Sequence, residues 1–406
     1  PLVVASVPVP LGWPRPLRRF RGIEDGRALL RDYTLSPANF GNLGQSMNYL
    51  SEAFIALLFL PILLLSEETD ESRRGDLSKF VSYAQGNLPV ILLAPHGGNV
   101  KPEGMPVMPR QTGRDVGTAE LAKAISDRLM FTDAQGVKRR PHLIINHLHR
   151  SFVEPNRSWS DNLKRGWLDT SGKPAGPHQG AERLHRAFHA SAASAVKKVE
   201  SEYKTGVLLD LHGLSLSRKL DMYGYLLRAS DLHQRKNLDR TATDAELAQR
   251  LRERSSIRTA ASGKKSAREI TELVRGSQSL ASLVDRAYRD LYPDLRNSED
   301  GQAGRPATPS ARFPNPKGSE TPDHTRTYFN GAYDIFIHSS RQAECRVDAI
   351  QIELTADARN TKVQRARFAR CMARALRQFL RIHYGLKMDP PGKPASTEVQ
   401  RVPRDE

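Results

Sequence analysis

Apolar runs that predict buried strands alternate with segments that have the periodicity of amphipathic helices. The strand-like runs occupy residues 88–94, 142–149, 206–213, 220–228 and 347–355. The helix-like segments occupy residues 118–130, 182–203, 276–292 and 362–383. Alternation of this kind predicts an α/β protein of three layers, in which a mostly parallel mixed sheet lies between helices.

Two of the apolar runs lead to a histidine. His96 follows the run Leu88–Ala94 within the letters PHGG, and His212 lies near the end of residues 206–213, which read GVLLDLHG. Side chains alternate along a strand, so Asp210 and His212 point to the same side. Ligands bind at the carboxyl ends of strands in open α/β sheets, which is where both histidines should lie. The alternative is that each histidine only ends its strand.

Two histidines and a carboxylate at such an edge suit a divalent metal ion, most often zinc. Cys345 and Cys371 are the only cysteines, so His and carboxylate side chains must hold the ion. A catalytic zinc needs three protein ligands and an open position for water. His96 and His212 supply two ligands, and Glu103 is the nearest acid after His96. We therefore predict one zinc ion.

Glu353 interrupts the otherwise apolar strand at residues 347–355. A buried acid costs several kcal/mol unless it is paired or takes part in chemistry. We therefore predict that Glu353 is the general base, which accepts a proton from water and passes it to the leaving nitrogen. The alternative is a structural ion pair inside the sheet.

The loop RSFVEPNRSWSDN follows the second strand-like run and supplies Arg150, Asn156 and Arg157. Guanidinium and amide groups bind carboxylates, and arginine does so with two parallel hydrogen bonds. We assign Asn156 and Arg157 to substrate binding and place Arg150 in the catalytic group with Glu353. The alternative is that these are solvated charges of a loop.

The motifs PHGG, PNR, DLHG, FNGAY and IQIEL, in this order, resemble the N-formylglutamate amidohydrolase family. The resemblance covers roughly Leu88 to Tyr384. It implies a fold similar to the zinc-dependent exopeptidases (phosphorylase/hydrolase-like), with a single zinc ion. It also implies hydrolysis of an N-formyl or related N-acyl bond of an acidic amino acid. By the same resemblance, His96 and His212 fall at metal positions, Arg157 at a carboxylate-binding position and Glu353 at the position of the general base.

The third metal position departs from the related pattern. Relatives with the carboxypeptidase pattern have the acidic ligand three residues after the first histidine, where this chain has Asn99. Glu103 is therefore our prediction for the third ligand, and Asp210 is the alternative.

These features predict a metal-dependent hydrolase that cleaves an amide of an acidic amino acid or a similar small carboxylate substrate. A metallocarboxypeptidase or amidase that acts on peptides or cell-wall fragments would use the same residues. A third interpretation is a non-catalytic binding protein that keeps the pocket, with a basic insert at residues 231–265 contacting an anionic polymer. The chain has no G-x-S-x-G motif, which argues against a serine nucleophile.

The amino end differs from the rest of the chain. Phe54–Leu65 is a continuous apolar run of 12 residues, too short to span a bilayer comfortably and typical of a signal-peptide core or an anchor. The alternative is a buried helix, although Pro61 interrupts the run. The run favours a secreted or membrane-associated protein. We expect an extension at residues 1–76, a catalytic domain at 77–386 with inserts near 231–265 and 297–323, and a tail at 387–406.

The charge favours an anionic substrate or partner. The 406 residues include 62 Lys and Arg against 45 Asp and Glu, for a net charge of +17. The basic residues are spread widely and do not interleave with aromatic residues, so we expect no nucleic-acid partner. A small acidic molecule is the expected substrate.

Overall fold

The computed structural model describes residues 80–103, 106–109, 113–176, 179–215, 217–232, 243–295 and 302–388, all within one compact unit, Leu65–Glu406. The apolar run at residues 54–65 and nearly all of the predicted tail lie outside the described residues. None of the helices described is long and apolar enough to cross a membrane. Secretion or membrane association stays a prediction.

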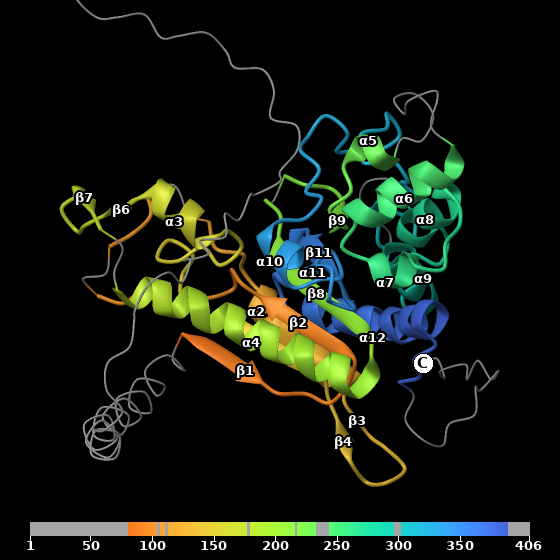
Figure 1. Ribbon diagram of the computed structural model, residues 1–406, viewed down its shortest axis with the longest axis horizontal. Coiled ribbons are helices and arrows are strands. Elements are labelled where there is room, and N and C mark those ends of the chain that lie inside the picture. Colours follow the sequence, from red (N-terminus) through yellow and green to blue (C-terminus); the bar gives the residue numbers. More distant parts are fainter. Residues whose placement is uncertain are drawn as a thin grey trace, which may run out of the picture. The chain divides into compact units, whose positions relative to one another are not determined.

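A seven-stranded mixed sheet with the order β1-β5-β2-β8-β11-β9-β10 forms the centre of the described residues (Figure 1). Its strands are β1 (Val81–Ala84), β2 (Val90–Ala94), β5 (His142–Asn146), β8 (Gly206–Gly213), β9 (Asp221–Gly224), β10 (Ala307–Thr308) and β11 (Val347–Leu354). The four neighbours β5, β2, β8 and β11 run parallel, and β1 and β9 run antiparallel to β5 and β11. The prediction of a mostly parallel mixed sheet is confirmed.

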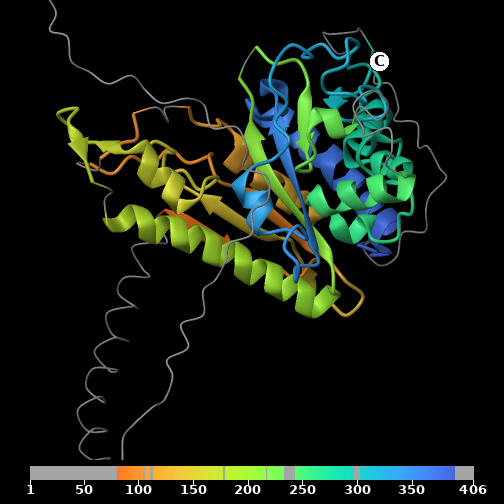
Figure 2. The same cartoon turned by 45° about the horizontal axis from the view of Figure 1, so that its top comes forward.

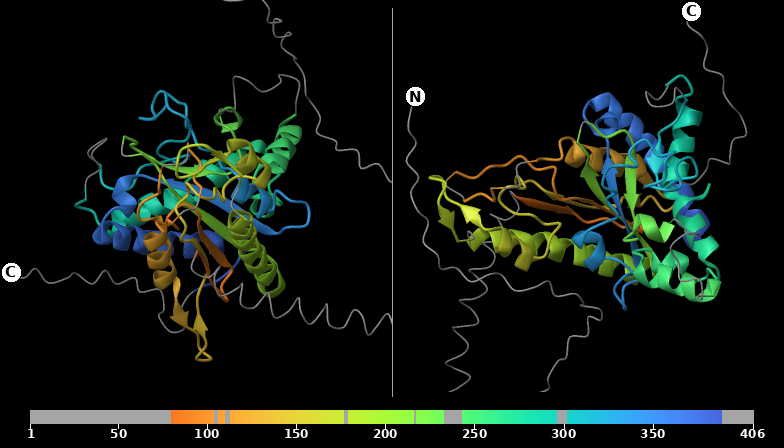
Figure 3. Two further views of the ribbon diagram at one scale, coloured as in Figure 1. Left: turned by 90° about the vertical axis from the view of Figure 1, so that its left-hand side faces the viewer. Right: turned by 90° about the horizontal axis from the view of Figure 1, so that it is seen from above.

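Helices cover both faces of this sheet (Figures 2 and 3). Three of these helices are α2 (Thr118–Leu129), α4 (Gln179–Tyr203) and α12 (Lys362–Tyr384). Ile91 and Leu93 of β2 share one core cluster with Phe188 of α4. Val90 and Leu92, which point the opposite way, share another cluster with residues of α2 and α12. Because both faces are covered, β2 is apolar at every position.

The described part of the insert predicted at residues 231–265 belongs to a helical layer. This layer contains α5 (Ala229–Leu232), α6 (Asp244–Arg254), α7 (Arg258–Ala261), α8 (Ala267–Arg275) and α9 (Leu280–Leu291). Ala248 and Leu251 of α6 and Ala261 of α7 belong to the same core cluster as α2 and α12. The outer face of α6 is exposed, as expected of a solvated insert, while these apolar residues attach it to the core.

The remaining elements are short. They are the hairpins β3 (Phe131–Thr132) to β4 (Lys138–Arg139) and β6 (Trp167–Leu168) to β7 (Pro174–Ala175), and the helices α3 (Trp159–Arg165), α10 (Tyr333–Ile337) and α11 (Ala356–Arg359). The second predicted insert, residues 297–323, is mainly loop where it is described, but it contributes β10 to the sheet edge. Phe313 and Asp323 of this segment are buried, so the segment packs against the domain.

Candidate metal centre

Parallel strands bring the predicted site residues to one edge of the sheet. β2 leads into His96, and His212 and Glu353 lie near the carboxyl ends of β8 and β11. The register of β8 and β11 places Glu353 opposite His212. The loop after β5 brings residues 150–157 to the same edge. The expected meeting of these segments is therefore seen in the structure.

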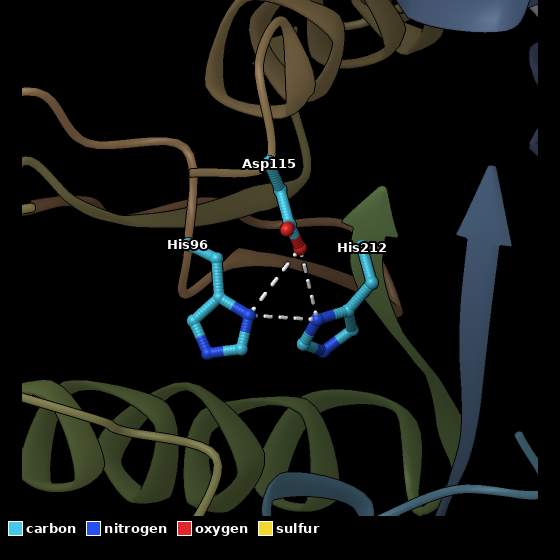
Figure 4. A group of neighbouring side chains, drawn as sticks. All are labelled: His96, Asp115 and His212. Carbon is cyan, nitrogen blue, oxygen red and sulfur yellow. Dashed lines mark hydrogen bonds and ion pairs between the residues drawn. The ribbon is translucent and has the colours of Figure 1, made fainter. Parts of the chain in front are cut away.

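His96, Asp115 and His212 form a compact group of donor atoms (Figure 4). The two Nδ1 atoms lie 3.0 Å apart, and Asp115 Oδ2 lies 3.3 Å from Nδ1 of His96 and 3.4 Å from Nδ1 of His212. All three residues are buried, with exposed fractions of 2%, 6% and 2%. The backbone N–H of Gly213 also donates to Asp115 Oδ2, at 3.0 Å.

The spacing of these donors fits a metal ion. Two neutral imidazole nitrogens that face each other at 3.0 Å repel through their lone pairs unless a proton or a cation lies between them. A tetrahedral zinc ion with bonds of about 2.0–2.1 Å needs donor atoms about 3.3 Å apart. The three edges of 3.0, 3.3 and 3.4 Å match that requirement. The group could therefore hold a metal ion, and its two nitrogens and one oxygen suit zinc.

A carboxylate lies behind each histidine. Glu154 Oε1 accepts a hydrogen bond from His96 Nε2 at 2.5 Å, and Asp210 Oδ2 accepts one from His212 Nε2 at 2.9 Å. With Nε2 protonated in both rings, each Nδ1 directs its lone pair toward the centre of the group. Carboxylates in this position fix the tautomer and orientation of metal-binding histidines.

The electrostatics favour positive charge at the centre of the group. Burial alone would raise the pKa of Asp115, but hydrogen bonds and charge from His212 and His96 hold it well below its usual range. Burial opposes the charged form of His212, yet the carboxylate of Asp210 raises its pKa well above the ordinary value. An imidazolium provides that charge in the absence of an ion, and a bound cation would provide it equally well.

The two glycines after His96 are required by close packing. A Cβ on Gly97 would lie 2.6 Å from a backbone nitrogen at the start of α2, and a Cβ on Gly98 would collide with the backbone of His147. Asp115 is tied to the same backbone, because its N–H donates to the carbonyl of His96 at 3.1 Å. The PHGG turn therefore passes between α2 and the loop after β5 with no room for a side chain.

Asp115, and not Glu103, lies with His96 and His212 in the donor group, so the geometry gives no support to Glu103 as the third ligand. Glu103 is exposed. Asp210, the alternative, contacts the opposite nitrogen of His212. The letters RDVGTAE around Asp115 look like the approach to a helix and were not assigned to the site. One signal could have pointed to Asp115. The loop between β2 and α2 begins at the carboxyl edge of the sheet, so an acid just before α2 can lie close to His96.

Glu353 lines a cavity of about 380 Å³ together with His96, Asp115 and His212. Its side chain is buried, and its Oε1 accepts a hydrogen bond from Gln351 Nε2 at 2.9 Å. Burial raises the pKa of Glu353, although the charge of His212 opposes the shift. A buried carboxylate that faces a cavity beside a metal-type donor group is suited to accept a proton.

Asn156 and Arg157 lie where substrate-binding residues would be needed. Asn156 Nδ2 lies 3.1 Å from His212 Nε2 and 3.3 Å from Gln351 Oε1. Arg157 lines the same cavity, and its Nη1 donates to the carbonyl of Asn156 at 2.5 Å. Their role in binding a carboxylate stays a prediction.

Arg150 also lines the cavity, but its guanidinium is bound to acids. It pairs with Glu154, and its Nη1 lies 3.7 Å from Asp115 Oδ1. The charges of Glu154 and Asp115 raise its pKa against the effect of burial. Arg150 thus neutralises the carboxylates beside the donor group, and a direct part in catalysis stays a prediction.

A second donor group shares His212 with the first. Asp210, His212 and Asp334 have ligand atoms within 4.8 Å of one another. Asp334 is the second residue of α10 and is fully buried. Neither of its carboxylate oxygens has a hydrogen-bond partner among the described residues. Burial and then the charge of Asp210 raise its pKa well above the ordinary value. Nothing in its local sequence, AYDIF, distinguishes it from a helix-starting acid.

Fold and site together define a mixed α/β protein with a buried His–His–Asp group at the carboxyl edge of its sheet. Comparisons with protein-family models and with curated proteins found no match. Among solved structures, the chain is similar to an N-formylglutamate amidohydrolase from Ralstonia eutropha JMP134, with 17% identity and a TM-score of 0.39 over 76% of this chain and 100% of that chain. It is also similar to a gene product from Agrobacterium tumefaciens, with 11% identity and a TM-score of 0.38 over 75% of this chain and 96% of that one. At these scores, a proposal of function has to rest on the geometry of the site.

Proposed function

We propose that the protein is a metal-dependent hydrolase that cleaves an N-formyl or related N-acyl amide of a small carboxylate substrate. The observation that carries the proposal is the donor triangle of His96, Asp115 and His212, with edges of 3.0–3.4 Å, beside the buried Glu353 in one cavity. The finer assignments, a single zinc ion and an exopeptidase-like fold, belong to the same proposal.

The donor group, Glu353 and Arg157 would each have a role in amide hydrolysis. A metal ion held by His96, Asp115 and His212 would polarise the amide carbonyl and lower the pKa of a water molecule. Glu353 accepts the proton of the attacking water and delivers it to the leaving nitrogen. Arg157 holds the substrate carboxylate, which fixes the amide in the cavity.

The amide of Asn156 has a different task from the guanidinium beside it. Its Oδ1 accepts the backbone N–H of Asp334 at 3.0 Å, so its Nδ2 is the end that faces His212. An amide fixed in this way orients the groups around it without changing charge.

Metal analysis and hydrolysis, measured on the same sample, test the proposal. The purified full chain should retain one zinc-like ion and hydrolyse N-formylglutamate. His212→Ala should lose both the ion and the activity, because the variant removes one of three ligands. His383→Ala is the matched control, since that imidazole lies on α12 and contacts the carbonyl of Gln278 instead of the site. Stoichiometric metal and full activity in His212→Ala would refute the proposal.

A further inference from the structure

Three guanidinium groups line the cavity, and they differ in what they contact. Arg150 is bound to Glu154, and Arg157 donates to the carbonyl of Asn156. Arg218, in the loop between β8 and β9, makes no side-chain hydrogen bond or ion pair with any residue that the structure describes. Its Nη1 is buried and without a partner.

An aromatic ring holds the Arg218 guanidinium in place. Its Cζ lies 5.5 Å from the centre of the Phe329 ring, within the range of a cation–π contact. Phe329 lines the same cavity and is 39% exposed. A guanidinium that lies over an aromatic face keeps its charge and its N–H groups for an anion.

Asp323 binds the backbone of the loop that carries Arg218, and not the guanidinium itself. Asp323 Oδ2 accepts the backbone N–H groups of Lys219 and Leu220 at 3.0 and 3.4 Å. Its Oδ1 lies 3.8 Å from Nε of Arg326. Burial lowers the pKa of Arg218 and the charge of Asp323 raises it, and the guanidinium remains charged at neutral pH. Arg218 therefore carries a charge into the cavity and forms no close ion pair with the described residues, while Asp323 and Glu353 act on it at longer range.

Arg157 and Arg218 come from opposite flanks of the site. Arg157 follows β5, and Arg218 precedes β9. In the sheet order, β2, β8 and β11 lie between those two strands, and they supply His96, His212 and Glu353. A substrate whose amide lies between the donor group and Glu353 would thus have one guanidinium toward each of its ends.

We propose that Arg218, which lies over the ring of Phe329, binds a second negative group of the substrate, on the acyl side of the amide. The substrate would then be an amino acid acylated by a dicarboxylic acid of several carbons, and hydrolysis would release the free amino acid and the diacid. This inference rests on the proposed function for the side of the bond, but the binding of a dianion does not require hydrolysis.

Binding of unreactive acids separates the inference from the hydrolytic proposal. We would measure succinate, glutarate and adipate by calorimetry, with butyrate as a single-charge analogue of glutarate. At least one diacid should bind more tightly than butyrate. Arg218→Ala should weaken that diacid about tenfold or more, the range of a charge-assisted hydrogen bond, and change butyrate less than about twofold. Arg157→Ala should weaken both ligands.

Arg374→Ala, which removes an exposed arginine of α12 paired with Asp290, should change neither ligand. Arg218→Lys should bind the diacid more tightly than Arg218→Ala and less tightly than the unchanged chain, because lysine keeps the positive charge but lacks the planar guanidinium. Diacids that bind no better than butyrate, or that bind equally to Arg218→Ala, would overturn the assignment.

A pair of amide substrates then tests the side of the bond. N-succinylglutamate carries a charge on its acyl group, and N-formylglutamate does not. Arg218→Ala should lower kcat/KM about tenfold or more for the succinyl substrate only. Equal losses for both substrates would overturn the acyl-side assignment. If neither substrate is hydrolysed while the diacid effect holds, the proposed hydrolase function fails and the anion site stands.

Discussion

Two buried carboxylates at the sheet have opposite surroundings. Asp221, at the start of β9, receives Arg305 Nε and Nη2 at 2.6 and 2.8 Å and the backbone N–H of Thr355 at 2.8 Å. Asp334, near the site, has no hydrogen-bond partner on either oxygen among the described residues. The imidazole of His189 lies 3.9 Å from Asp334 Oδ1, but burial lowers the pKa of His189 to about 2, so this ring brings no positive charge.

The difference shows which buried charges serve the fold. The Asp221 cluster is closed by groups of the chain itself, so it needs nothing from solution. Asp210 and Asp334 together leave three buried oxygens without a partner, which costs free energy that the fold must offset elsewhere. Native proteins accept such costs mainly at functional sites. Buried atoms without a partner among the described residues also occur elsewhere, at the hydroxyls of Tyr223 and Tyr225, but the unpaired carboxylate oxygens of Asp210 and Asp334 lie together beside the donor group.

The largest effect should come from breaking the closed cluster. Arg305→Ala leaves the carboxylate of Asp221 buried and without its cation, and we expect a loss of about 3–5 kcal/mol in the free energy of unfolding, measured by urea denaturation. Arg374→Ala, which breaks an exposed pair with Asp290, should cost no more than about 1 kcal/mol. Similar losses for the two variants would remove the distinction between the clusters.

Within the site, Glu353→Gln should affect catalysis without affecting stability. The amide keeps the shape of the side chain and can still accept the hydrogen bond from Gln351, but it cannot take a proton. We expect kcat to fall about 10²-fold or more, with metal content and unfolding free energy close to those of the unchanged chain. Activity within about twofold of the unchanged chain would return Glu353 to a structural role.

Replacing the unpaired carboxyl group of Asp334 by an amide should stabilise the protein. In the unfolded chain this carboxyl is ionised at pH 7, whereas burial and the charge of Asp210 oppose its ionised form in the fold. Asp334→Asn has no charge to lose on folding, so the free energy of unfolding should rise by about 1–2 kcal/mol. Asp221→Asn, the same change in the closed cluster, should lower it. If both substitutions lower the free energy of unfolding, the carboxylate of Asp334 must be stabilised in solution as the carboxylate of Asp221 is.

The smallest effect concerns His142. Its hydrogen bonding is intermediate between that of Asp221 and that of Asp334, because only one of its two ring nitrogens has a partner among the described residues. Its Nδ1 accepts from Tyr83 Oη at 2.9 Å and from the backbone N–H of Gly86 at 3.2 Å, whereas its Nε2 has no described partner. Burial lowers its pKa from 6.5 to about 4. Between these values the unfolded chain binds the extra proton, so stability decreases as the pH falls through this window.

His142 alone should account for about 1 kcal/mol between pH 6.5 and about pH 5.5. His142→Gln should reduce the pH dependence of the unfolding free energy by that amount, measured by denaturation at a series of pH values. Identical pH dependence in the two proteins would mean that the pKa of His142 is the same in the folded and the unfolded chain.

The sheet and half of the site were accessible from the sequence for a physical reason. Strands buried on both faces are apolar throughout, so the polar residues that end them, His96 and His212, stand out, as does Glu353 inside the last strand. Asp115 did not stand out, because a residue in a loop is placed by chain closure and not by a period. Arg218 was missed for the same reason, since its position depends on contact with Phe329 from a distant loop.

The glycines at positions 97 and 98 have a consequence for how this site can change over evolution. The PHGG turn is wedged against α2 and the loop after β5, so substitution there would displace His96 and Asp115 together. Arg218 and Phe329 line the same cavity but supply no atom of the donor group. New substrate preferences should therefore arise through side chains such as these two, while the turn that carries His96 stays fixed.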